Sequence, residues 1–273
     1  MTALYRERRK CGHFFRCFSD FIGSSNKVMA TFVAWGNIRQ DYPFQTIPSE
    51  LVPERLHLSS DGESINGNSR VRQRHHCRRL AHFLLWRLCG QAGIDTGLLS
   101  HIYYTASGRP EFPSNRIDFN ISHSGDWVAV ILSVSSAKPA VGIDIEIAKT
   151  ERNFTALLAH FAPQTEQRWL AKQSNIVAGF YRCWCLREAV LKSQGVGIVK
   201  LSEVRHLPER QQIRTAYCPA GQLFFSEELP FYLALFAAGN ELDDVRYFHW
   251  SPGTERGLCA YSLKSAVKYS VNF

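Results

Sequence analysis

The sequence predicts a folded chain that mixes α-helices with β-strands. Its 273 residues are 45% hydrophobic, which suffices for a sizeable core in one large domain or two smaller ones. Aromatic residues make up 12% and charged residues 21%, a balance that argues against global disorder. Segments with helical periodicity alternate with short apolar runs of strand length.

The start of the chain differs from the rest. Residues 1–28 are first basic, then aromatic, and end in Gly, Ser and Asn. Met29 is the only methionine after the first residue, and residues 31–35 form an apolar run typical of a strand. We therefore predict that residues 1–28 are a poorly structured extension and that the folded domain opens at Met29.

The remaining elements follow in order. Residues 41–69 are rich in Pro, Ser, Gly and Asn, which predicts loops. Leu80, Phe83, Leu84 and Leu88 share one side of a helix predicted over residues 70–88, which Gly90 or Gly93 can end. Further strands are predicted at residues 101–105, 117–121, 127–134, 141–147 and 231–237, turns at 107–110 and 124–126, and helices at 153–161, 163–172 and 175–194.

Charge and cysteine content bound the partners and the compartment. The formal net charge is +8, which favours an anionic partner such as a nucleotide, a nucleic acid or an acidic protein. The eight cysteines include no C-x-x-C pair, so we expect reduced thiols and a cytoplasmic protein. No apolar run is long enough for a membrane-spanning helix.

The segment 141–146, Val-Gly-Ile-Asp-Ile-Glu, places two acidic residues two apart. On a strand, Asp144 and Glu146 then share one face while Ile143 and Ile145 take the other. Neighbouring carboxylates repel unless a cation lies between them, and oxygen ligands suit Mg²⁺. The alternative is an ordinary half-buried strand with a polar face.

A second motif lies on the helix predicted over residues 175–194. Trp184, Glu188 and Lys192 stand at i, i+4 and i+8, one above another on one helical face. Glu188 could add a third carboxylate, and Lys192 a positive charge for a phosphate. The alternative is a Glu–Lys pair on the surface that contributes little to stability.

The segment 119–125, Phe-Asn-Ile-Ser-His-Ser-Gly, ends a predicted strand. Ser122 and His123 should lie at its rim but on opposite faces, and the G-x-S-x-G pattern of hydrolases is absent. His123 as a donor to a phosphate is the better hypothesis than serine hydrolysis. A hydrogen-bonded structural turn is the alternative.

Together these segments resemble the 4'-phosphopantetheinyl transferases of the surfactin-synthetase type, which include holo-[acyl-carrier-protein] synthases. The resemblance rests on a Gly-Arg-Pro turn at 108–110, the Phe-Asn-x-Ser-His-Ser segment at 119–124, Gly-Ile-Asp-x-Glu at 142–146, and Trp-x-x-Arg-Glu-Ala-x-x-Lys at 184–192. It covers roughly residues 30–240. Arg109, Cys185 and Arg187 replace residues that are more usual in the family, and none of them is a metal ligand there.

The resemblance implies an α+β fold of two similar halves related by a pseudo-twofold axis, with coenzyme A in the cleft between them. The halves would span residues 29–139 and 140–250, and residues 251–273 would form a C-terminal tail. Such a plan makes a monomer the expected state.

The resemblance also implies the site residues. Asp144, Glu146 and Glu188 would bind Mg²⁺, with Glu188 and Lys192 catalytic. Contacts with coenzyme A, the co-substrate, would come from Ser122, His123, Asp144, Arg187 and Lys192, and from Arg109 and Pro110 in the nucleotide pocket. Family members place cations for the 3'-phosphate near the start of the helix at 70–88, where Arg74 and Arg78 lie four apart; a solvated basic face explains that spacing equally well.

The expected second substrate is an acidic apo-carrier protein with an acceptor serine, and neither nucleic acid nor a membrane is expected as a partner. Two rival functions remain open at this stage. One is another coenzyme A-dependent transferase, which would move an acyl group and release the free thiol. The other is a non-catalytic basic protein that binds nucleic acid through residues 70–79, with an affinity that salt weakens.

Overall fold

The computed structural model describes residues 30–57, 69–149, 152–253 and 257–273. The predicted extension at residues 1–28 lies outside these described residues. Every predicted strand and helix named above falls within them.

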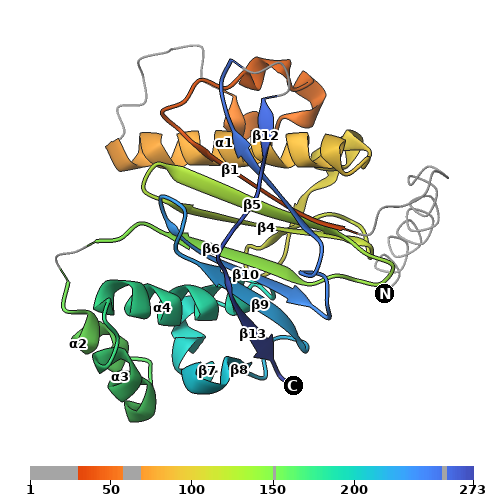
Figure 1. The fold of residues 1–273 in the computed structure, drawn as a ribbon. Coiled ribbons are helices and arrows are strands. Elements are labelled where there is room, and N and C mark those ends of the chain that lie inside the picture. Colours follow the sequence, from red (N-terminus) through yellow and green to blue (C-terminus); the bar gives the residue numbers. More distant parts are fainter. Residues whose placement is uncertain (1–29, 58–68, 150–151, 254–256) are drawn as a thin grey trace, which may run out of the picture.

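Two β-sheets lie face to face between two long helices, as Figure 1 shows. The first sheet has the order β12-β11-β1-β5-β4 and the second β6-β10-β9-β13-β8-β7. Helix α1 (Ser69–Gln91) covers the first sheet and α4 (Ile176–Lys192) covers the second. The α+β class predicted from the sequence is confirmed; the pseudo-twofold relation stays a prediction.

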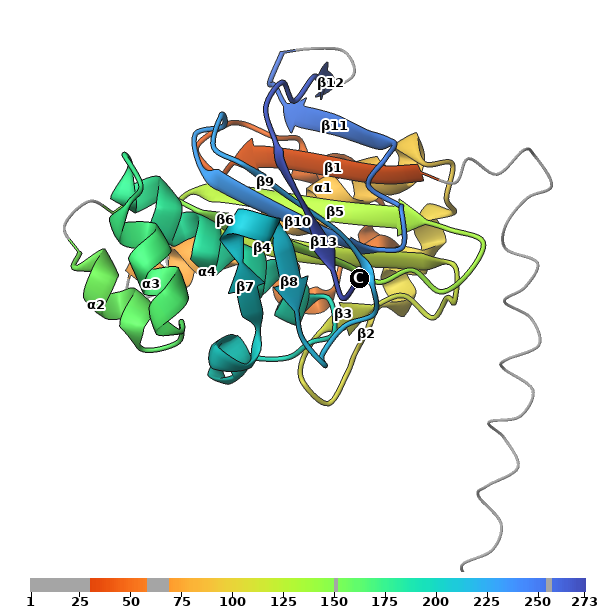
Figure 2. The same cartoon turned by 60° about the horizontal axis from the view of Figure 1, so that its bottom comes forward.

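The strands and helices have the following bounds. The first sheet contains β1 (Ala30–Asn37), β4 (Ile117–Ser124), β5 (Trp127–Val134), β11 (Val245–Trp250) and β12 (Leu258–Tyr261). The second contains β6 (Val141–Glu146), β7 (Arg205–Leu207), β8 (Gln212–Arg214), β9 (Gly221–Ser226), β10 (Tyr232–Ala238) and β13 (Val267–Val271). Strands β2 (Tyr103–Tyr104) and β3 (Pro110–Glu111) pair with each other, and the short helices α2 (Phe154–Ala159) and α3 (Gln164–Ala171) lie beside α4, as Figure 2 shows.

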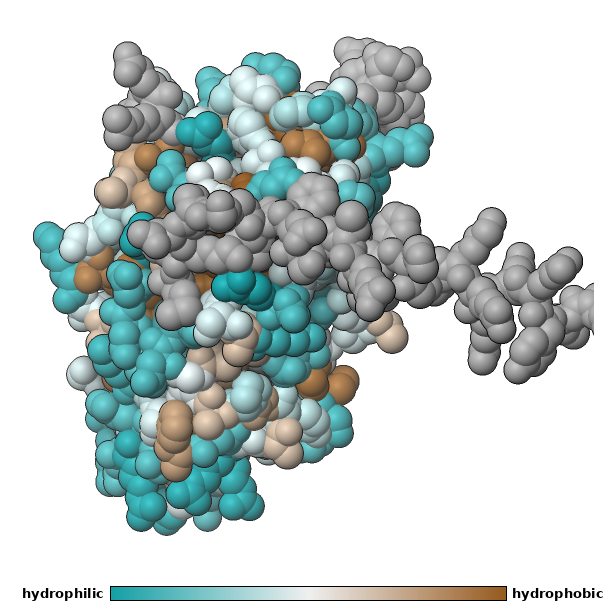
Figure 3. Space-filling model, turned by 90° about the vertical axis from the view of Figure 1, so that its right-hand side faces the viewer, coloured by the Kyte–Doolittle hydropathy of each residue, from teal (hydrophilic) through white to brown (hydrophobic). Residues whose placement is uncertain are grey.

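The hydrophobic core fills each gap between these layers. The predicted stripe of α1, from Leu80 to Leu88, is buried against the first sheet. Residues such as Val33 and Ile131 meet Ile143 and Leu235 between the two sheets. The outer surface is different: the uncovered part of the face in Figure 3 is mainly hydrophilic, with small, separate apolar patches. None of the described helices is long and apolar enough to cross a membrane.

The last strands of the chain belong to both sheets. Strand β11 pairs in parallel with β1, and β12 extends the first sheet beyond it. Strand β13 pairs with β9 in the second sheet. Residues from the predicted second half and from the predicted tail therefore complete both sheets, while the domain boundaries themselves stay predictions.

Strand β4 is longer than the sequence predicts. Its register with β5 runs as far as Ser124 opposite Trp127. The chain reverses at Gly125, whose φ of +56° lies in the left-handed region that glycine adopts without strain. Ser122 and His123 therefore lie inside the strand rather than at its end.

Candidate active site

Asp144, Glu146 and Glu188 gather where α4 crosses β6. The pleat of β6 turns Asp144 and Glu146 away from Ile143 and Ile145, which are buried between the sheets. Helix α4 approaches closely because Gly142 has no side chain: a Cβ there would lie 1.9 Å from the carbonyl oxygen of Ala189. This approach brings Glu188, one residue before Ala189, over the two strand carboxylates.

The three carboxylates disfavour one another's charge. Burial raises the pKa of Glu188 to about 7, and the negative charge of Asp144 adds to this effect. Burial and then Asp144 also raise the pKa of Glu146. Among the described residues, Asp144 Oδ2 and Glu188 Oε1 are buried without a hydrogen-bond partner. Such oxygens are costly to bury unless a cation satisfies them.

These residues fit a hard divalent cation that keeps part of its hydration. Within the described part of the chain, the one group of three donors whose ligand atoms all lie within 4.8 Å is instead Glu166, Cys183 and His206. Asp144, Glu146 and Glu188 are therefore more widely spread. Mg²⁺ could bond directly to some of these carboxylates and reach the others through the waters that it usually retains, with phosphate oxygens completing its shell.

Basic groups border the carboxylates. Lys192 Nζ lies 2.8 Å from Ser122 Oγ and 3.1 Å from Asp144 Oδ1. Partial burial lowers the pKa of His123, and the positive charges of Lys192, Arg74 and Arg78 lower it further. The structure thus brings α1, β4 and α4 together around a region that favours anions.

Ser122 and His123 do not form a nucleophile–base pair. Ser122 Oγ donates a hydrogen bond to Asp144 Oδ1 at 3.1 Å. His123 is on the other face of β4, the face that carries Phe119 and Ile121 against α1. The alternation predicted from the sequence is confirmed.

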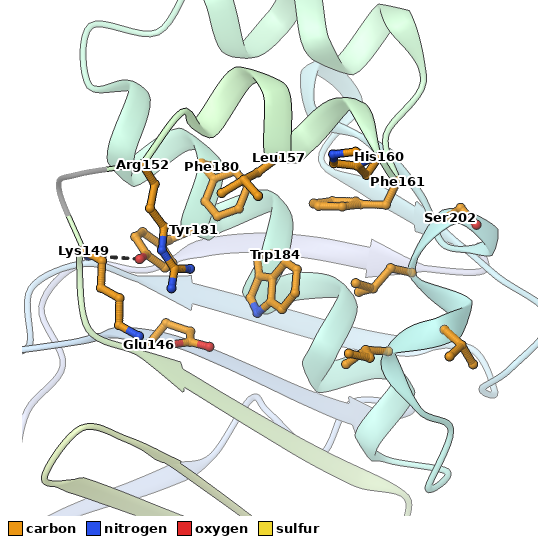
Figure 4. Close-up of a pocket in the computed structure, with 13 residues that line it drawn as sticks. Glu146, Lys149, Arg152, Leu157, His160, Phe161, Phe180, Tyr181, Trp184 and Ser202 are labelled. Carbon is orange, nitrogen blue, oxygen red and sulfur yellow. Dashed lines mark hydrogen bonds between the residues drawn. The ribbon is translucent and has the colours of Figure 1, made fainter. Parts of the chain in front are cut away.

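A cavity of about 540 Å³ opens beside the carboxylates. Figure 4 shows Glu146, Lys149 and Arg152 at one end, Phe161 at the other, and Trp184 between them. The other lining residues are mainly apolar and come from α2, α4 and the 3₁₀ segment η6 (Ile198–Glu203). Trp184 lies one helical turn before Glu188, so the cavity leads to the acidic cluster.

Comparisons with known proteins identify the family of this chain. The model of the 4'-phosphopantetheinyl transferase superfamily matches residues 140–235, which include β6 and α4. A Haemophilus influenzae protein named as a candidate 4'-phosphopantetheinyl transferase is 53% identical over 89% of this chain and 100% of its own length. This chain belongs to the 4'-phosphopantetheinyl transferase superfamily.

More distant members match about a third of the chain. The 4'-phosphopantetheinyl transferase AcpT of Salmonella typhimurium is 33% identical over 36% of this chain and 50% of its own length. The 4'-phosphopantetheinyl transferase gsp of Aneurinibacillus migulanus is 33% identical over 33% of this chain and 36% of its own. Members of the superfamily are phosphopantetheine-transferring enzymes, and this chain is one of them.

Arg109, expected from the superfamily to line the nucleotide pocket, points into the protein. Its guanidinium is 5% exposed and bonds to both oxygens of Asp118 at 2.8 Å and to Glu111 at 3.0 Å. Its Nε also donates to the carbonyl of Lys192 at 3.2 Å. Arg109 therefore ties the first sheet to the end of α4. Each of its three guanidinium nitrogens already donates to a partner inside the protein. Pro110 is half-buried at the start of β3.

Arg187 is also absent from the site, contrary to the expectation that it contacts coenzyme A. Its side chain is fully buried and pairs with both oxygens of Glu166 at 2.8 and 2.5 Å. His206 bonds to the same carboxylate at 2.7 Å. One residue along a helix is about 100° around its axis, so Arg187 faces the core while Glu188 faces Asp144 and Glu146.

Sequence reasoning missed two sets of residues in this region. The first is the aromatic wall of the cavity, including Phe161 and Phe180. The second is Asp118 and Asn120, which alternate with Ile117 and Phe119 and precede Ser122 and Ser124 on the same face of β4. This recurrence of a polar residue at every second position is visible in the sequence and could have indicated a functional strand face.

Proposed function

We propose that this chain transfers the 4'-phosphopantetheine group of coenzyme A to a serine of an apo acyl or peptidyl carrier protein, with Mg²⁺ as cofactor. The observation that carries the proposal is the pair of unpartnered buried oxygens, Asp144 Oδ2 and Glu188 Oε1, in a cluster bordered by basic groups. A divalent cation would neutralise the unpartnered carboxylate oxygens, and the pyrophosphate of coenzyme A would pair with the basic groups.

Asp144, Glu146 and Glu188 are the residues that would hold Mg²⁺. When bound, the ion neutralises charge on the phosphate oxygens and makes the phosphorus more electrophilic. Lys192 now pairs with Asp144 Oδ1 at 3.1 Å. Neutralisation of Asp144 would release this ammonium to contact a phosphate instead.

Glu188 is the proposed general base, directly or through a bound water. In the metal-free protein burial raises the pKa of this carboxyl to about 7. A bound cation would favour its ionised form, which is the form that can accept a proton. The carrier serine oxygen forms a bond to the β-phosphorus, and the bond from that phosphorus to the bridging oxygen breaks. The serine proton passes to Glu188 and 3',5'-ADP leaves, with Lys192 stabilising the charge on the leaving group.

Arg74 and Arg78 are proposed to bind the 3'-phosphate, because both act electrostatically on His123 at the same end of α1. Replacing both with Ala should weaken coenzyme A binding at least tenfold, measured by calorimetry, and should change 3'-dephospho-coenzyme A binding little. Arg70 and Arg72 are exposed on the same helix, so their double Ala variant is the matched control. An equal loss for both ligands would refute the assignment.

The cavity lined by Trp184 suits the pantetheine arm. That arm is an uncharged chain of amides and methylenes, and such ligands favour an apolar pocket with a few polar groups at its rim. Glu146, Lys149 and Arg152 supply the polar end. We therefore place the arm along Trp184, with its phosphate at the carboxylates.

The deciding experiment incubates the protein with Mg²⁺, coenzyme A and a panel of apo-carrier proteins, and follows the intact mass of each carrier. One carrier should gain the mass of a phosphopantetheine group while 3',5'-ADP is released. Asp144→Ala should fold and lose at least a thousandfold in rate, because it removes a cation ligand without touching the core. Release of the free coenzyme A thiol would indicate acyl transfer instead, and full activity in excess chelator would exclude the metal-dependent mechanism.

A further inference from the structure

Strands β4 and β6 are the edge strands of different sheets, yet they run beside each other. Among the described strands, β4 forms backbone hydrogen bonds only with β5, and β6 only with β10. No strand ladder joins β4 to β6. A strand edge leaves every second backbone N–H without a sheet partner. Because such groups are costly to bury unpaired, the junction of the two sheets needs another source of acceptors.

Four side chains of β4 supply those acceptors, and we call them the polar row: Asp118, Asn120, Ser122 and Ser124. They accept hydrogen bonds from the backbone N–H groups of Val141 (2.9 Å), Ile143 (3.0 Å), Ile145 (3.2 Å) and Ile147 (3.1 Å), in that order. Donors and acceptors both recur every second residue. The polar row therefore replaces the missing strand ladder and fixes the register of β6 against β4.

The length of the side chains in the polar row changes along the strand. Asp118 and Asn120 reach β6 with four-atom side chains, and Ser122 and Ser124 with two-atom side chains, at nearly equal bond lengths. The side chains that bridge the two strands are therefore shorter at the serine end. That end carries the site, since Ser122 Oγ also donates to Asp144 at 3.1 Å and Ser124 Oγ to Glu146 at 2.7 Å.

Asn120 connects this junction to α4 as well. Its Oδ1 accepts from Ile143 N at 3.0 Å, and its Nδ2 donates to the carbonyl of Lys192 at 3.4 Å. The side chain is buried, with the whole residue 5% exposed. No hydrogen bond joins it to Asp144, Glu146 or Glu188, although it sits between the strand that carries two of them and the helix that carries the third.

We propose that Asn120 is a positioning residue, which holds β6 and the end of α4 in the register that brings the three carboxylates together. The cation-binding part of this inference rests on the proposed function, whereas the register itself does not. Removing the Asn120 side chain would leave the Ile143 N–H without an acceptor and would free β6 to shift. The carboxylates would then retain their chemistry but lose their common geometry.

The test compares Asn120→Ala with Asn120→Asp in the full chain. Hydrogen exchange of the β6 backbone amides should accelerate at least tenfold in Asn120→Ala and stay near the wild-type rate in Asn120→Asp, which keeps the acceptor. Mg²⁺ titrated into the protein with 3',5'-ADP should bind about tenfold more weakly to Asn120→Ala, while 3',5'-ADP binding without Mg²⁺ changes less than twofold. A merely structural loss would not separate these two affinities.

Thr31→Val is the control, because Thr31 Oγ1 and Ser133 Oγ form a buried hydrogen bond of 3.1 Å within the first sheet. This variant should leave β6 exchange and Mg²⁺ binding unchanged. Wild-type exchange in Asn120→Ala would overturn the proposal. If Asn120→Ala does not fold, rapid exchange of the β6 amides in Asn120→Asp would overturn it too. A wild-type protein that binds Mg²⁺ but transfers nothing would instead remove the proposed function and leave this inference standing.

Discussion

At the scale of single residues, Glu188 is a site carboxyl whose pKa is set by burial and by its acidic neighbours. It lies on a buried helical face opposite Asp144, and its pKa rises from 4.5 to about 7. The folded protein therefore binds a proton between these pH values that the unfolded chain has released. Because of this difference, the contribution of Glu188 to the stability of the metal-free protein should fall as the pH rises from about 4.5 to 7.

Glu188→Gln should remove that loss, because the amide carries no charge at any pH in this range. With no metal present, we expect the variant to be more stable than wild type at pH 8 by about 3 kcal/mol, and equally stable near pH 4. Denaturant unfolding at both pH values measures the difference. Glu209→Gln, at an exposed position, is the control. The prediction fails if Glu188→Gln keeps the pH dependence of wild type.

At the scale of elements, the site depends on how closely α4 lies against β6. Gly142 permits this approach because its missing Cβ would otherwise meet backbone atoms of Ala189 and Ser193. The glycine of the Gly-Ile-Asp motif therefore has a packing role, whereas Asp144 and Glu146 of the same motif face the site. The Arg187–Glu166 pair holds α4 to α3 on the opposite side of the helix.

Gly142→Ala should destabilise the protein by at least about 2 kcal/mol, since the new methyl group must push backbone apart in a packed interior. Gly90→Ala is the control, because here the added methyl group should increase the free energy of unfolding instead of lowering it. Gly90 lies in α1, and a methyl group added there would meet no atom within 4 Å, so alanine should stabilise the helix by about 0.5–1 kcal/mol. Denaturant unfolding compares both variants with wild type, and equal stability of the two would contradict the packing role.

At the scale of the whole molecule, the candidate site is assembled from both sheets and both long helices. Strand β4 and α1 contribute Ser122, His123 and the arginines, whereas β6 and α4 contribute the carboxylates and Lys192. The net charge of the chain is +8. An acidic carrier protein would therefore be attracted to this chain before it makes specific contacts.

Association with an acidic apo-carrier should therefore slow as salt increases. Raising the ionic strength from about 0.05 to 0.5 M should reduce the association rate about tenfold or more and change the dissociation rate much less. Stopped-flow fluorescence with a labelled carrier measures both rates. A rate of association that is independent of salt would show that charge does not steer this encounter.

The sequence by itself determined the features that depend on local periodicity. Alternation along a strand placed Asp144 and Glu146 opposite Ile143 and Ile145, and helical spacing placed Trp184 above Glu188. The order of the motifs also indicated the superfamily, which the comparison with the Haemophilus influenzae protein confirms. These features need only neighbours within one element, so the sequence contains them directly.

Only the tertiary structure decided where the charged side chains find their partners. Arg109 and Arg187 stand in motifs that suggested ligand contacts, yet Asp118 and Glu166 bind them inside the protein. The polar row of β4 meets β6 across a junction of two sheets, and β11 reaches back to pair with β1. Each of these contacts joins segments brought together by packing of the whole chain. A buried charge or an open strand edge needs a partner, and the fold determines which one lies within reach.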